Sequence, residues 1–172
     1  MAVPPYWKNF FGLPMTEDED QTLKYPYLEL YTHVTDKNIQ LFTTVGTLIV
    51  GPIIAAVKGP RTASNISRLA LKSGTVGIGI ACVTGPLMTY ARVKNDPVEK
   101  VFDRSYRLRH NRNQVNVDRF YRAGLLAGLA GAAFGVTQAR STLVVLGIVG
   151  GTLAGGVYNT MVPDEKKKNA DK

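Results

Sequence analysis

The chain has 172 residues, and 21 Lys and Arg against 13 Asp and Glu give it a formal net charge of +8. Its single cysteine, Cys82, excludes an intrachain disulfide, and two histidines leave a transition-metal site without an ordinary ligand set. The length favours one domain, and basic charge without a nucleic-acid motif favours anionic lipid or an acidic partner over nucleic acid.

Residues 1–37 form an arm that is rich in aromatic and acidic side chains. Three Lys against six acids give it a net charge of −3. Seven aromatic residues between Tyr6 and Tyr31 favour a position at a membrane interface or on a partner, and a disordered tail is the alternative. The acidic run at 17–20 and the lack of arginine before Arg61 argue against a secretory signal or a cleavable transit peptide.

Four stretches that follow contain no charged residue, and each is close to the roughly 20 residues with which a helix crosses a bilayer. They are Asn38–Val57, Ser73–Ala91, Ala123–Ala139 and Ser141–Pro163. They predict an all-α membrane protein with four transmembrane helices, arranged as two antiparallel hairpins. In a membrane domain at 38–160 we expect spans at about 39–57, 69–91, 120–139 and 142–160, followed by a basic tail at 161–172.

The connector at 92–119 predicts an amphipathic helix that begins after Asp96, with Pro97 in its first turn. Val98, Val101, Phe102 and Tyr106 fall on one apolar face. This face suits a membrane surface or a protein partner, and a merely solvated helix is a third possibility. The candidates for contact with anionic lipid headgroups or an acidic partner are Arg104, Arg107, Arg109 and Arg112.

Glycines repeat at intervals of four along the third and fourth spans. This spacing places them on one helix face, where a neighbouring backbone approaches closely. The predicted helix-packing residues are Gly124, Gly128, Gly131, Gly135, Gly147, Gly151 and Gly155.

The charge distribution leaves the membrane orientation open. The termini and the connector share one side and carry sixteen Lys and Arg, and the two hairpin turns carry five. The positive-inside rule places the termini on the side of the membrane that retains positive charge.

The segment Tyr90–Pro97, which ends in a basic and polar stretch before Asp-Pro, and the glycine-rich segment Asp118–Ala139 resemble a subunit family of mitochondrial NADH:ubiquinone oxidoreductase (complex I). This family, that of alpha-subcomplex subunit 11, shares a four-helix fold with the Tim-type inner-membrane translocases. The resemblance implies termini in the intermembrane space, as in most Tim-type proteins, whereas for a mitochondrial protein the charge count places them in the matrix. The resemblance extends loosely over 39–158. A longer arm, a basic insert near 98–117 and a lysine-rich C-terminus depart from the family pattern.

The resemblance implies a non-catalytic accessory subunit in the mitochondrial inner membrane, where it supports assembly and stability of complex I. Its expected partners are the core membrane subunits of complex I and an anionic lipid such as cardiolipin, with no nucleic acid or small-molecule substrate. The spans hold no carboxylate or histidine, which argues against an ion-coupled pump, and we expect no catalytic residue, cofactor or metal.

The alternative function is a component of a Tim-type protein translocase. That function predicts a stripe of Thr, Ser and Asn facing a water-filled groove. An accessory subunit instead buries those groups against neighbouring helices.

Overall fold

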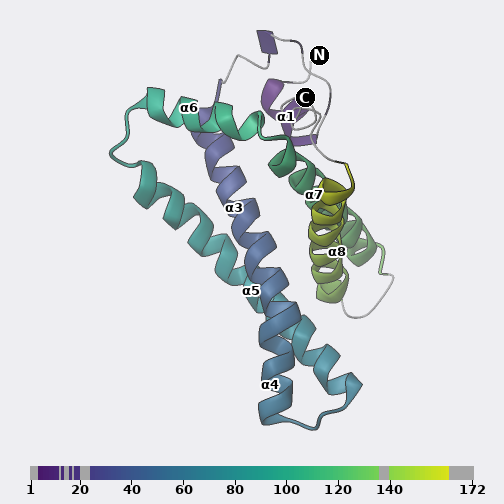
Figure 1. The fold of residues 1–172 in the computed structure, drawn as a ribbon. Helices are drawn as coiled ribbons and strands as arrows, with labels where there is room; N and C mark the ends of the chain where they lie inside the picture. Colours follow the sequence, from purple (N-terminus) through teal and green to yellow (C-terminus); the bar gives the residue numbers. More distant parts are fainter. Residues whose placement is uncertain are drawn as a thin grey trace, which may run out of the picture.

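The computed structural model describes residues 4–11, 13, 16, 18–19, 24–135 and 140–162. Within these residues the secondary structure is helical and contains no strand. Figure 1 shows α1 (Pro5–Phe11), α6 (Val98–Arg109) and the Met161 end of α8 at one end of the molecule, and the turn between α4 and α5 at the other. The predicted basic tail lies almost wholly outside the described residues.

The first long helix is a rod made of α3 (Pro26–Val45), the π-helix η1 (Gly46–Val50) and α4 (Gly51–Lys58). It begins at Pro26, well before the predicted start at residue 39, because proline suits the first turn of a helix. Pro52 has no backbone N–H, and the wider π turn lies directly before it, with the Gly51 N–H bonded to the Gly46 carbonyl. The helix thus passes the proline without a break.

Helix α5 (Ala63–Val93) returns antiparallel to this rod. Its N-cap is Thr62, whose hydroxyl accepts the Asn65 N–H at 3.3 Å. The register is fixed by close backbone approaches. A Cβ added to Gly46 would lie 2.7 Å from the Ser73 carbonyl oxygen, and one added to Gly85 would lie 2.8 Å from the Thr35 Cα.

Helix α6 crosses the end of the first hairpin (Figure 1). Val101 is fully buried in a cluster with Leu30 of α3 and Val93 of α5. The Ser105 hydroxyl donates to the Pro26 carbonyl at 2.8 Å. Part of the predicted apolar face therefore covers the protein's own helices, while Phe102 stays exposed.

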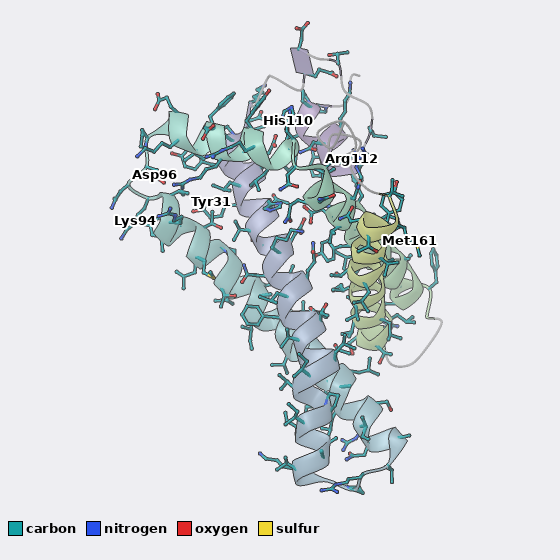
Figure 2. All side chains as sticks on the ribbon, viewed as in Figure 1. Tyr31, Lys94, Asp96, His110, Arg112 and Met161 are labelled. Carbon is teal, nitrogen blue, oxygen red and sulfur yellow. The ribbon has the colours of Figure 1, made fainter. Side chains whose placement is uncertain are left out.

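Turns join α6 to its two neighbours at this end of the molecule. Lys94 and Asp96 lie in the turn from α5, and His110 and Arg112 lie where α6 passes into α7 (Figure 2). These short connections hold α6 against the bundle.

The second hairpin consists of α7 (Arg112–Ala133) and α8 (Arg140–Met161). Three helical segments are long and apolar enough to cross a membrane: Pro26–Lys58, Ala63–Val93 and Arg140–Met161. Helix α7 is not among them, because its first half is charged and its uncharged part ends at Ala133. About eleven residues at 1.5 Å each give that part roughly 16 Å, half the thickness of a hydrocarbon core.

Candidate functional site

The helices of the second hairpin touch backbone to backbone at five of the seven glycines selected by their spacing. These five are Gly124, Gly128, Gly147, Gly151 and Gly155. A Cβ on Gly124 or Gly147 would overlap the other residue's carbonyl oxygen, and one on Gly128 would lie 2.5 Å from the Leu143 carbonyl oxygen. Backbone atoms do not yield as a flexible side chain does, so a larger residue here would separate the helices.

The other two glycines of this set lie in different surroundings. A Cβ on Gly131 would lie 3.1 Å from the Leu143 side chain, which is a close but adjustable contact. Gly135 lies beyond the end of α7 with φ +68°, a conformation that favours glycine, and an added Cβ would meet nothing within 4 Å. Gly135 therefore shapes the turn and does not pack against a helix.

The first hairpin has an equivalent stripe of small residues. Gly74, Gly77, Ala81 and Gly85 of α5 are buried, and they recur at intervals of three and four. This periodicity is visible in the sequence, but the predicted packing set was drawn only from the third and fourth spans. Both hairpins thus use the same kind of contact.

A buried carboxylate, Asp118 of α7, joins α7 to α3. Its Oδ1 accepts hydrogen bonds from Lys37 Nζ at 2.6 Å and Gln40 Nε2 at 2.9 Å, and its Oδ2 lies 3.1 Å from His33 Nδ1. Residues 33, 37 and 40 share one face of α3, because they are spaced by four and three. One aspartate therefore collects three partners from a single helix face.

The Asp118 side chain is only 7% exposed, so its charge must be compensated inside the protein. The Lys37 ammonium is its cationic partner, and the Gln40 amide donates to the same oxygen. Removing one partner of such a buried pair leaves the other charge without compensation, which costs stability.

One turn further along α7, Arg122 ties a second pair of elements. Its Nε and one terminal nitrogen both donate to Asp36 Oδ2, at 3.0 and 2.9 Å. Its other terminal nitrogen donates to the Phe10 carbonyl at 2.9 Å, and the guanidinium lies 4.3 Å from the centre of the Phe10 ring. The aromatic helix α1 is thereby fastened to the bundle.

These residues border a cavity of about 50 Å³ between α1, α3, α6 and α7. A water needs roughly 10–15 Å³ measured in this way, so a few ordered waters fit. The lining includes Thr32, His33, Arg119 and Arg122, together with Tyr6, whose hydroxyl is 2.9 Å from the Thr32 hydroxyl. The cavity is too small for an organic substrate.

The charged residues of α3 and α7 described above form an ion-pair layer, centred on Asp118 and Arg122. This layer lies at the same depth as uncharged parts of the other helices. Thr35 contacts Gly85, which belongs to the uncharged stretch of α5, and Val117 contacts Gly155 in the uncharged part of α8. The sequence predicts no ionisable group within the spans, but the adjoining turns of α3 and α7 bring such groups level with them. Residues 33, 36, 37 and 40 are spaced so that they fall on one helix face, and this spacing is the feature of the sequence that could have predicted the ion-pair layer.

The four arginines predicted to contact lipid or a partner lie around α6. Arg104 pairs with Asp96 at 2.6 Å, so Asp96 serves as an ion-pair partner. Arg107 pairs with Asp103 on the exposed face at 2.6 Å. The Arg109 side chain is 2% exposed and forms two hydrogen-bonded contacts with the Glu29 carboxylate of α3.

Arg109 is thus an internal tie between α6 and α3. Arg112, which begins α7, and Arg107 are exposed at this end of the molecule. For these arginines, contact with lipid headgroups or an acidic subunit stays a prediction.

Comparison with known protein families gives a match. A family model described as "Protein of unknown function (DUF1757)" matches residues 6–158. No curated protein matches the chain. Among the described residues, no three or more His, Cys, Asp or Glu side chains are grouped so that they could hold a metal ion.

Proposed function

The chain belongs to the DUF1757 family, whose function is described as unknown, and we propose that it is a non-catalytic accessory subunit of mitochondrial complex I. In this proposal it is a multi-pass protein of the inner membrane that supports assembly and stability of the membrane arm. Its role is to hold helices together and against a larger host.

The observation that carries this proposal is the inward position of several hydroxyl groups in the middle of the membrane helices. Thr43 and Thr47 are buried where the first rod meets Gly74 of α5 and Val145 of α8. The buried Thr89 hydroxyl donates to the Gly85 carbonyl at 2.9 Å within its own helix. Such groups support a packed bundle, since a translocase would turn them toward water.

The outward surface of the helices supports the same role. Large apolar side chains are more than half exposed on α4, α5 and α8: Ile53, Val57, Val83, Leu87 and Leu146. Among lipid tails or the core subunits of a larger complex, these side chains are in a matching environment.

Helix α7 gives a reason why the protein works within a host. We propose that it is the fourth membrane span, although its uncharged part covers only half of the hydrocarbon thickness. Asp118 and Arg122 are compensated by α3, but Arg119 is exposed in the same half of the helix. A neighbouring subunit that covers this part of α7 would remove the cost of exposing it to lipid.

The size of the assembly tests this proposal. A tagged copy of the full chain, extracted from mitochondria in digitonin, should migrate on native gels with the megadalton respiratory assembly. Loss of the protein should lower NADH:ubiquinone oxidoreductase activity and the amount of assembled complex. Migration with a smaller import complex, and slowed import of carrier proteins, would instead support the translocase.

A further inference from the structure

The end of the molecule formed by the two hairpin turns carries positive charge without any acid. Its basic residues are Lys58, Arg61, Arg68, Lys72 and Arg140. The sequence contains no Asp or Glu between Lys37 and Asp96, nor between Arg122 and Asp164. At the other end, basic groups such as Arg104, Arg109 and Arg122 pair with carboxylates. The uncompensated end therefore attracts anions.

An apolar groove of about 390 Å³ lies between the first rod and α5. Its apolar lining includes Phe42, Val45, Val50, Ile54, Leu69 and Ile80. Along α5 the lining runs from Leu69 to Ile80, which corresponds to roughly 16 Å of helix. A single leaflet contributes about half of the roughly 30 Å hydrocarbon core, so the groove matches the depth of one acyl chain.

A second recess of about 420 Å³, which lies between α5 and the start of α8, adjoins this groove. Lys72 and Val76 line both spaces. The recess is also lined by Arg68, Thr75, Ser141 and Thr142. The Thr75 hydroxyl already donates to the Leu71 carbonyl at 3.0 Å within its own helix. The Lys72 ammonium, the Arg68 guanidinium and the Ser141 and Thr142 hydroxyls are the donors that a phosphate group needs.

We propose that the groove and the recess together bind one anionic phospholipid. Its phosphate lies beside Lys72 and Arg68, and one acyl chain lies along the groove. The combination decides between occupants, because a hydrophobic partner helix would not need the cations at one end and a free anion would not need the groove. The proposal rests on the placement of these helices in a membrane and not on the identity of the host complex.

Lipid titration of the purified full chain in a neutral detergent tests the proposal. Phosphatidylglycerol should raise the unfolding temperature more than phosphatidylcholine, and native mass spectrometry should show one retained molecule. In Arg68→Gln/Lys72→Gln the apparent affinity for phosphatidylglycerol should fall by at least about tenfold. The matched control, Lys58→Gln/Arg61→Gln, loses the same charge at the same end and should keep its affinity.

Val76→Trp tests the groove without altering charge, because a larger side chain at this position occupies space that the acyl chain needs. It should weaken phosphatidylglycerol binding, and native mass spectrometry should then show less retained lipid. Equal loss in the two double variants would overturn the proposal in favour of diffuse charge attraction. Full competition by inorganic phosphate, or unchanged lipid binding in Val76→Trp, would overturn the role of the acyl chain.

Discussion

Replacing Asp118 by Asn should remove the central charge of the ion-pair layer between α3 and α7. The Asp118 carboxylate is only 7% exposed and accepts hydrogen bonds from Lys37 and Gln40. A hydrogen bond to a charged group contributes about 1.5–3 kcal/mol, so loss of the charged bond to Lys37 should cost about 2 kcal/mol. The substitution also leaves the Lys37 ammonium without its carboxylate partner. We expect the unfolding temperature to fall by about 4–8 °C at pH 7.

Thermal unfolding in detergent micelles, followed by circular dichroism, measures this fall. The matched control is Asp103→Asn, which removes an exposed partner of Arg107 and should cost at most about 0.5 kcal/mol. Equal unfolding temperatures for the two variants at pH 7 would refute the reasoning.

Two further substitutions test the contacts of α7. Gly128→Leu should lower the unfolding temperature and the yield of assembled complex, because overpacking costs about 1–3 kcal/mol. The control Gly156→Leu, at an open position, should have little effect. Equal stability of the two variants would contradict the backbone contact at Gly128. Arg122→Gln should release α1. Limited trypsin digestion followed by mass spectrometry should then detect faster cleavage after Lys8 than in wild type. An unchanged cleavage rate would show that other contacts hold α1.

The uncharged stretches predicted the long helices because length and lack of charge are local properties. They located most of the first rod, α5 and α8, and the spacing of four found the close approach of Gly124 to Gly147. A helix face of small residues can be recognised in the sequence even when the partner helix is not known.

The start of α3 and the ion-pair layer depended on information from distant parts of the chain. Glu29, Asp36 and Lys37 made this segment resemble a polar arm, but Arg109 and Arg122 compensate two of these charges from about 80 residues away. A single sequence does not show which charges meet. For the same reason the covering of α3 by α6 was not predicted.

The end of α7 differed from the prediction for a local reason. A lack of charge does not require a helix, and Ala123–Ala139 contains the turn residues Phe134 and Gly135 after only part of a span. Gly135 has a positive φ and lies just past the end of the helix. The spacing of the glycines had instead placed it on the predicted helix-packing face.

The register of the first hairpin also has a consequence for the surrounding lipid. Because Gly46 meets Ser73 and Thr35 meets Gly85, the uncharged stretches of the rod and of α5 are offset by about nine residues, or roughly 14 Å along the helix axis. A flat bilayer of uniform thickness cannot match both hydrophobic bands. The leaflets next to this protein must therefore tilt or thin, and such a deformation favours neighbours with a similarly short hydrophobic belt.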